Sequence, residues 1–319
     1  MGAKRNAGIE LYRVILTFGI VLLHAMTTCG HVPTGVCARG SYFLYSCVVG
    51  FVFISGWFGI KSNVMRILKV WGVAVYAAAV MGTVDVVLNG WRGFDIYFRI
   101  LTGNWFLNGY TVLILFAPLV NLAIETRKYR ALFGLAGLVF GWAFLLTVPH
   151  VRDFIPRSAG VVDYSGVTLL GIYAMARMMR VCDVESRLTL CHKSCLLGLS
   201  LVAIACHLSS YASPFAFALS GIVFLWFKNR TLTSKVERAV FLLAPSMFTI
   251  FMLHANSVGF SLMDRMIDWF VGIGVRLNVS LVLTAGAAFC VGCLLDVPRR
   301  VCRGCSVRLR KSGIISSND

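Results

Sequence analysis

Acidic residues are scarce in this sequence, with 13 Asp and Glu against 30 Lys and Arg in 319 residues. The long apolar runs lack the alternation of apolar and polar residues that a β-barrel requires, so we do not expect that fold. The first apolar run is followed by further runs and not by a small-residue cleavage site, so we do not expect a cleavable signal peptide. Linkers and low-complexity segments are also missing. We expect a single membrane domain over residues 1–298 and a basic cytoplasmic tail over residues 299–319.

Apolar residues dominate what is present. They make up 58% of the chain, charged residues make up 13%, and the mean hydropathy is +0.81. Several runs reach the roughly 20 residues that a helix needs to cross a bilayer. We therefore predict an all-α polytopic membrane bundle of about ten transmembrane helices. The expected spans are 9–28, 41–60, 67–88, 105–124, 131–148, 161–177, 194–209, 211–227, 240–258 and 279–295.

The distribution of Lys and Arg indicates how these spans are oriented. Most of them lie in loops on the side of the N-terminus. Because cytoplasmic loops of membrane proteins are enriched in Lys and Arg, we expect both termini in the cytoplasm. The same enrichment explains the net charge of +17, so we do not expect nucleic-acid binding. The basic residues assigned to the outer side are Arg39, Arg92, Arg99, Arg152, Arg157, Arg265 and Arg276.

The first expected span carries ionisable residues in an apolar helix. Residues 8–28 read GIELYRVILTFGIVLLHAMTT and include Glu10, Arg13 and His24. Ionisable groups inside a membrane are costly and suggest a functional site. Taken singly, Arg13 would fit a snorkelling cation and His24 a hydrogen-bonded core residue. Because the two lie about 16 Å apart along one helix face, they favour a site for an extended substrate.

Several segments carry a resemblance to a known family. RVILTFGIVLLH, from Arg13 to His24, resembles the first-helix signature of the acyltransferase-3 family. FVFISGWF is similar to that family's Phe-Phe-x-x-Ser-Gly element, although Val52 replaces the second Phe. NWFLNGYTVLILFAPLVN, GVTLLGIYAMAR and PSMFTIFMLHAN resemble further helices, so the resemblance covers the chain in order. Members of the family are integral-membrane O-acyltransferases, mostly bacterial, which modify cell-surface glycans with acetyl-CoA or related thioesters.

The resemblance implies an O-acetyltransferase of a bacterial inner membrane, with acetyl-CoA or another cytosolic acyl-CoA as donor. Guanidinium groups suit phosphate, so the expected donor-binding residues are Arg13, Arg66 and Arg177. Glu10, one turn before Arg13, is expected to belong to the same site. His24 and Arg13 form the expected catalytic pair, with His24 as general base on a hydroxyl of a glycan or lipid-linked saccharide. A transient acyl-histidine is the alternative route. No metal is expected.

Four further residues are expected to line the substrate cavity, each with a structural alternative. The serine and the glycine would also fit close helix packing, and the tryptophan would also fit an aromatic belt at the membrane interface. The histidine would also fit a hydrogen-bonded packing role. These residues are Ser55, Gly56, Trp105 and His254. Tyr173 and Asn121 are expected to form hydrogen bonds between helices rather than to belong to the site.

Cysteines and outer acidic residues give weaker signals. The eleven cysteines are scattered, and Cys29 and Cys37 in the first outer loop form either a disulfide or two unpaired thiols. Asp163, Asp264 and Asp268 are expected to be solvated charges of outer loops, and the alternative is that one of them contacts the acceptor glycan.

A transporter or flippase of a lipid-linked sugar is the alternative function, since it would also use buried charges around a polar cavity. Transporters of this size often contain repeated halves, and nothing in the last five spans repeats the spacing of Arg13 and His24. A membrane scaffold or sensor would leave this pair without a role. We therefore expect an enzyme whose partners are acyl-CoA, a saccharide acceptor and membrane lipid.

Overall fold

The computed structural model describes residues 5–27, 36–61, 64–91, 93–147, 165–206, 208 and 210–302, and every regular element in these ranges is a helix. Six helical segments are long and apolar enough to cross a membrane. They are Ala7–Thr27, Gly40–Phe58, Val64–Asn89, Trp105–Glu125, Ser234–His254 and Leu277–Cys302. The all-helical fold is confirmed and these segments indicate a membrane protein. The count of ten spans and the cytoplasmic termini are not confirmed.

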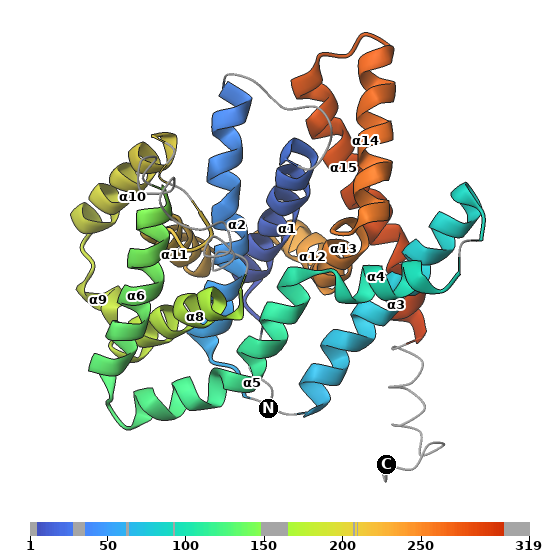
Figure 1. The fold of residues 1–319 in the computed structure, drawn as a ribbon. Coiled ribbons are helices and arrows are strands. Elements are labelled where there is room, and N and C mark those ends of the chain that lie inside the picture. Colours follow the sequence, from blue (N-terminus) through green and yellow to red (C-terminus); the bar gives the residue numbers. More distant parts are fainter. Residues whose placement is uncertain are drawn as a thin grey trace.

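The other four expected spans correspond to α6 (Tyr129–Thr147), α8 (Gly166–Val181), α10 (Leu190–Ala205) and α11 (Pro214–Lys228). The last three have 16, 16 and 15 residues, fewer than the roughly 20 that a membrane crossing needs. With α9 (Val184–Arg187), they gather on one side of α2 (Val36–Phe58), as Figure 1 shows.

Helix α1 (Ala7–Thr27) lies at the centre of the bundle (Figure 1). It packs on α2 and α11 on one side and on α13 (Met247–His254) and α15 (Leu277–Leu295) on the other. Leu16 and Ile20 belong to the hydrophobic cluster with α2, whereas Val21 and Ala25 belong to the cluster with α13 and α15. Both hydrophobic clusters therefore hold α1 in place.

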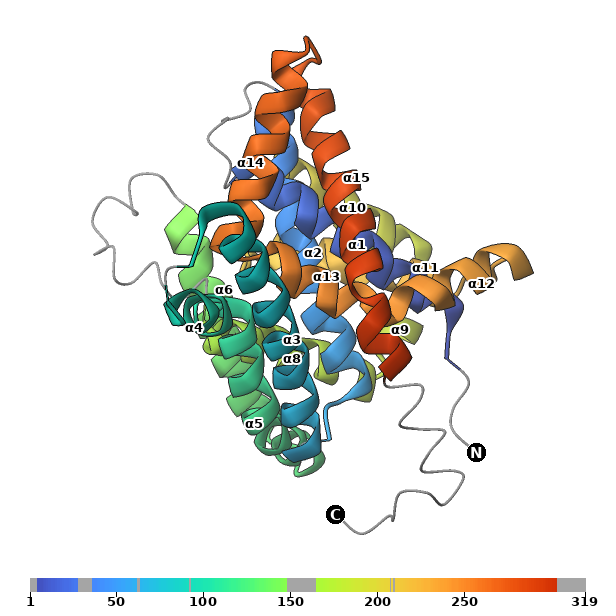
Figure 2. The same ribbon diagram turned by 90° about the vertical axis from the view of Figure 1, so that its right-hand side faces the viewer.

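Helices α3 (Val64–Asn89) and α5 (Trp105–Glu125) flank the short helix α4 (Asp95–Thr102) in sequence. The expected ninth span is divided into α12 (Ser234–Leu243), the 3-10 turn η2 (Ala244–Ser246) and α13. Pro245 lies in this turn, where its missing N–H interrupts the α-helical hydrogen bonding. Figure 2 shows α12 projecting from the body and α14 (Ser257–Gly272) running beside α15.

Helix α14 corrects one expectation. Asp264 and Asp268 lie in this helix and not in an outer loop. Its buried residues Val258, Met263 and Ile267 form an apolar side, while the acidic residues interrupt the apolar run. An amphipathic helix of this kind is too polar to be identified as a span, which is why the sequence suggested a loop.

Candidate active site

Two histidines meet where α1 packs on α13. The Nδ1 atom of His24 lies 2.9 Å from the Nε2 atom of His254, and the ring centroids are 5.0 Å apart. His254 is 5% exposed, whereas the His24 side chain is partly exposed. The sequence places both residues near the outer ends of their expected spans but does not predict that they touch. We call these two side chains the histidine pair.

Hydrogen bonds give the histidine pair a direction. The Nδ1 atom of His254 lies 2.7 Å from the carbonyl oxygen of Ile250. Because a carbonyl only accepts, this Nδ1 carries the proton, and the Nε2 atom of a neutral His254 is an acceptor. His24 then donates from Nδ1 to His254, which places the lone pair of a neutral His24 on Nε2. In this tautomer, Nε2 of His24 can take a proton from a reacting group.

Aromatic side chains surround the histidine pair. The Phe260 ring lies edge-on to His24, with centroids 5.3 Å apart, and the Phe251 ring lies 6.4 Å from the same imidazole. The Phe251 ring is also 5.8 Å from that of His254. These contacts keep both imidazoles in a largely apolar environment.

Two asparagines that sequence analysis did not single out fix the backbone after His254. Asn104 caps α5 and donates a hydrogen bond of 3.1 Å to the carbonyl oxygen of Ala255. Asn256 caps α14, and both asparagines are buried. An Asn directly before a helix is a recognisable capping signal, so the caps were readable in the sequence. The contact across helices was not, because it depends on the packing of α5 near α13.

The other end of α1 carries a charged cluster, which we call the basic end. Glu10 is 4% exposed, and its Oε1 atom lies 2.9 Å from guanidinium nitrogens of both Arg5 and Arg13. The Oε2 atom of Glu10 is buried without a hydrogen-bond partner among the described residues. The Arg13 side chain is 34% exposed. Glu10 thus orients Arg13, whose guanidinium keeps an exposed side for an anion.

The surface of α1 between the basic end and the histidine pair is closed. Because α1 is uninterrupted, Arg13 and His24 lie on the same side of the helix, with Thr17 and Ile20 between them. Thr17 is 0% exposed and Ile20 is 2% exposed. Two hollows of about 300 and 140 Å³ among the described residues are lined by other side chains. A tunnel from Arg13 to His24 therefore stays a prediction.

Arg66 and Arg177, which are expected to bind the donor, lie near one loop at residues 59–61. Arg66 donates to the carbonyl oxygen of Lys61 at 3.3 Å. The Arg177 guanidinium packs against Gly59, where an added Cβ would lie 3.0 Å from its Cζ atom. The Nε atom of Arg177 is buried without a hydrogen-bond partner in the described part of the chain. The structure gathers these two cations at the loop and places Arg13 with Glu10 on α1.

Ser55 and Gly56 face α5 and α8. The Ser55 hydroxyl oxygen lies 3.1 Å from the carbonyl oxygen of Phe51 and 3.2 Å from the hydroxyl oxygen of Tyr110. A Cβ on Gly56 would lie 2.5 Å from the carbonyl oxygen of Tyr173, so α8 can approach this closely only because the residue is glycine. These contacts match the packing alternative that the sequence leaves open for both residues.

Trp105 lies at the start of α5, two rings away from the histidine pair. Its ring centroid is 5.2 Å from that of Tyr211 and 5.7 Å from that of Phe106. Phe106 lies 5.1 Å from Phe251, which contacts both histidines. An aromatic row therefore connects Trp105 with the pair.

Tyr173 and Asn121 form the interhelical hydrogen bonds that were predicted for them. The Tyr173 hydroxyl accepts from the backbone N–H of Ile60 at 2.8 Å and donates to Oδ1 of Asn121 at 2.9 Å. The Asn121 amide donates to the carbonyl oxygen of Ile60 at 3.0 Å. This closed set of bonds holds the end of α2 to α5 and α8, and the prediction is confirmed.

A polar hollow of about 140 Å³ lies between α3 and α14, beginning three residues after His254. On α3, Asp85 accepts a hydrogen bond of 2.7 Å from the Asn89 amide. On α14, two hydroxyls and one guanidinium follow each other at successive turns. The polar lining residues are Asp85, Asn89, Ser257, Ser261 and Arg265. We call this site the α3–α14 hollow, and its mixture of donors and acceptors suits a ligand rich in hydroxyl groups.

Several residues named above lie outside what the structure describes: Cys29, Arg92, Arg152, Arg157, Asp163 and the side chains of Cys37 and Arg39. Within the described ranges, no group of three or more His, Cys, Asp or Glu side chains is arranged to hold a metal ion.

Comparison with known proteins identifies no relative: no family model, no curated protein and no solved structure matches the chain. The similarity of the Arg13–His24 segment to the acyltransferase-3 signature therefore stays a prediction.

Proposed function

We propose that this chain is an integral-membrane acyltransferase, which moves an acyl group from a cytosolic acyl-CoA to a hydroxyl of a glycan or lipid-linked saccharide. Acetyl-CoA is the proposed donor, and a bacterial inner membrane the proposed location. The observation that carries the proposal is the directed hydrogen-bond chain from Ile250 through His254 to His24. This chain supports His24 as a general base because it places the lone pair on Nε2.

In the proposed step, the acceptor hydroxyl gives its proton to Nε2 of His24 while its oxygen attacks the thioester carbonyl. The carbon–sulfur bond breaks, the new ester forms, and the proton passes to the departing thiolate of CoA. The imidazolium that forms in between keeps its Nδ1 hydrogen bond to His254. His254 is thus a positioning residue, since it holds the His24 ring and its tautomer without touching the reacting atoms.

The basic end supplies the proposed donor contact. Arg13 has a partly exposed guanidinium, which suits a phosphate of CoA, and Glu10 fixes its direction. Because Thr17 and Ile20 are covered, we propose that the packing around these two residues opens when the acyl arm binds, while the contact between His24 and His254 is kept. Such gating steps are common in enzymes that enclose their substrates.

The α3–α14 hollow supplies the proposed acceptor contact. It follows His254 directly along the chain, and Asp85 and Arg265 offer an acceptor and a donor for sugar hydroxyls. Its volume of about 140 Å³ is below the roughly 300–1,000 Å³ of pockets that enclose drug-sized ligands. It would therefore hold one end of an acceptor rather than enclose a long glycan.

The proposal is tested by incubating membranes that contain the protein with radiolabelled acetyl-CoA and following the label into surface glycan. His24→Ala should lower the rate by about 10²–10⁴-fold, the usual contribution of a general base. His192→Ala is the matched control, because His192 lies exposed on α10 and should leave the rate unchanged. Full labelling with His24→Ala would remove the proposed base. If no thioester labels any glycan, the result would favour the alternative function, a transporter or flippase.

A further inference from the structure

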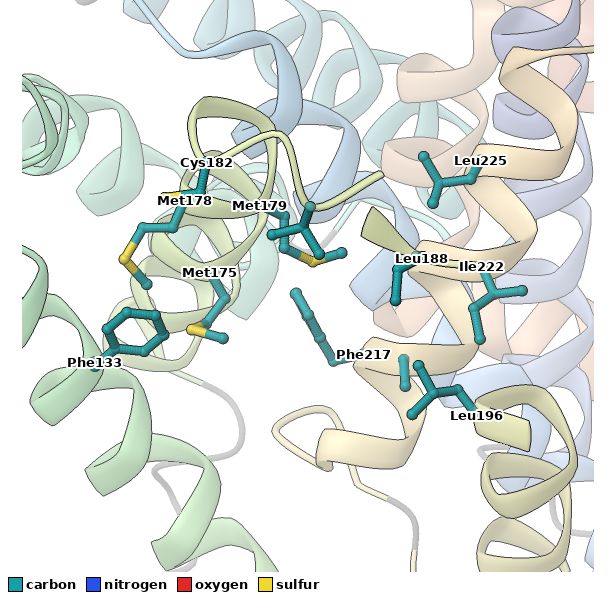
Figure 3. A pocket seen from close by; sticks show the side chains of 13 residues that line it. Phe133, Met175, Met178, Met179, Cys182, Leu188, Leu196, Phe217, Ile222 and Leu225 are labelled. Atoms are coloured by element: carbon teal, nitrogen blue, oxygen red, sulfur yellow. The ribbon is translucent and has the colours of Figure 1, made fainter. Parts of the chain in front are cut away.

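The larger of the two hollows is an apolar groove among the short helices. It measures about 300 Å³ and lies between α6, α8, α10 and α11. Figure 3 shows three methionines of α8 directed into it, opposite Phe217 and Ile222 of α11. Those methionines are Met175, Met178 and Met179. Every residue that lines the groove is apolar or a cysteine, so water would find no hydrogen-bonding side chain there. We call it the methionine groove.

A group of cations lies at one end of the methionine groove. Leu225 is part of the lining, and Lys228 follows it one turn later on α11. Lys228 binds Glu185 of α9, between the lining residues Val184 and Leu188. The groove therefore ends where charged side chains begin.

Positive charge prevails in this group. Partial burial by itself would raise the pKa of Glu185, but hydrogen bonds from Lys228 and Asn229 and the nearby charge of Lys193 lower it below its ordinary value. Glu185 is thus an anion, and it balances only one of the cations around it. The neighbouring Arg187 is exposed, which leaves its guanidinium open to a ligand.

The same end of the groove has a tryptophan between two cations. The Lys228 ammonium lies 5.1 Å from the centre of the Trp57 ring, and the Arg180 guanidinium lies 5.4 Å from it. Both distances fall within the range of cation–π attraction. These contacts hold the two cations close to the apolar helices instead of letting them extend into solvent.

We propose that the methionine groove binds an anionic phospholipid, with an acyl chain between α8 and α11 and the phosphate near Arg187 and Lys193. An apolar groove in a membrane protein suits hydrocarbon, and Met side chains adapt to flexible chains. The net positive charge at its end complements an anionic headgroup, because basic pockets between membrane helices bind such lipids. This binding site is separate from the histidine pair and does not depend on acyl transfer.

Native mass spectrometry of the full-length protein in mild detergent tests the proposal. The probes are dioleoyl-phosphatidylglycerol and dioleoyl-phosphatidylcholine, which share their chains and differ in charge. We expect tighter binding of phosphatidylglycerol, and a loss of about fivefold in this preference for each cation removed in Arg187→Gln and Lys193→Gln. The control Lys235→Gln/Arg238→Gln removes two exposed cations of α12 and should leave the preference unchanged.

A second variant tests the chain rather than the headgroup. Ala218→Trp places a large side chain in the groove and should reduce binding of both lipids, whereas Ala79→Trp on the exposed side of α3 should not. Equal binding of the two lipids by the unmodified protein would overturn the proposal. The proposal would also be overturned if each variant of the groove lost no more binding than its control variant elsewhere on the protein, because the methionine groove would then not be the binding site. An unchanged elution profile and melting temperature show that a variant is folded.

Discussion

Buried polar groups at the two ends of α1 are stabilised in different ways. At the basic end, one carboxylate pairs with two guanidiniums: Glu10 accepts from Arg5 and Arg13, and one of its oxygens has no partner among the described residues. At the other end, His24 and His254 need no charge, because each hydrogen bond runs from a donor to a neutral acceptor. One helix therefore carries an ionic cluster and a neutral relay.

This difference separates two kinds of chemistry. A buried charge must be paired, so the basic end responds when another anion competes with Glu10 for Arg13. A neutral imidazole with a defined tautomer responds when a reacting group offers a proton to its lone pair. The comparison predicts that substitutions at the histidine pair change the rate, while substitutions at the basic end change stability and donor affinity.

After the loss of the base itself in His24→Ala, the largest effect is expected from His254. His254→Leu removes the acceptor for Nδ1 of His24 and leaves a buried donor unsatisfied, at a cost of about 1–3 kcal/mol, which corresponds to a loss of about 5- to 160-fold in kcat. His254→Gln should restore part of the rate, since its amide oxygen can accept the same hydrogen bond. Labelled acetyl-CoA turnover measures both. If the two variants are equally impaired, His254 acts through packing and not through the tautomer of His24.

The next effect concerns the stability of the basic end. Glu10→Ala leaves the Arg5 and Arg13 guanidiniums without their shared carboxylate and should lower the free energy of unfolding by about 1–3 kcal/mol. The melting temperature of the purified protein in detergent measures this loss. Asp95→Ala is the control, because its ion pair with Arg99 spans 3.7 Å between exposed side chains. Equal melting temperatures for Glu10→Ala and the unmodified protein would show that the cluster does not stabilise α1.

A smaller effect is expected on donor affinity. Arg13→Ala removes a charged hydrogen-bond donor and should raise KM for acyl-CoA about tenfold with little change in kcat, because Arg13 lies away from the reacting atoms. Lys69→Ala removes an exposed cation of α3 and should leave KM unchanged. Equal increases of KM in both variants would mean that bulk positive charge, and not Arg13, attracts the donor.

The sequence predicted the histidine end only in part. His24 was identified because it is an ionisable residue in an apolar helix and the helical period places it on the same face as Arg13. Helix α1 is continuous, as expected. The partner His254 lies 230 positions away, and the spacing within one helix says nothing about which helices pack together. The hydrogen bond from His254 to the Ile250 carbonyl, four residues earlier in α13, also depends on the rotamer of His254, which the sequence does not give.

The predicted spans agree with the structure where apolar runs are long. They disagree where the runs are short or interrupted by charged residues. All six segments able to cross a membrane were expected, since run length alone identifies them. Helices α10 and α11 are real elements, but their 16 and 15 residues do not support two full spans. Helix α14 was missed because Asp264 and Asp268 interrupt its apolar pattern, although its buried side is apolar.

The smallest expected effect is the dependence of stability on pH at the Lys228–Glu185 pair, which lies next to the basic end. The Asn6 amide donates to the carbonyl oxygen of Lys228 at 3.0 Å, which joins the start of α1 to the Lys228–Glu185 pair. Burial tends to raise the pKa of Glu185, but Lys228 and Asn229 lower it below the ordinary value of 4.5. A lowered pKa means that the pair stabilises the fold above pH 4.5 and that this stability is lost as the pH falls through the folded value. Between about pH 6 and about pH 3.5, the unmodified protein should therefore lose about 0.5–1 kcal/mol more stability than Glu185→Gln. Parallel melting curves for the two proteins over this range would exclude the Lys228–Glu185 pair as a source of acid sensitivity.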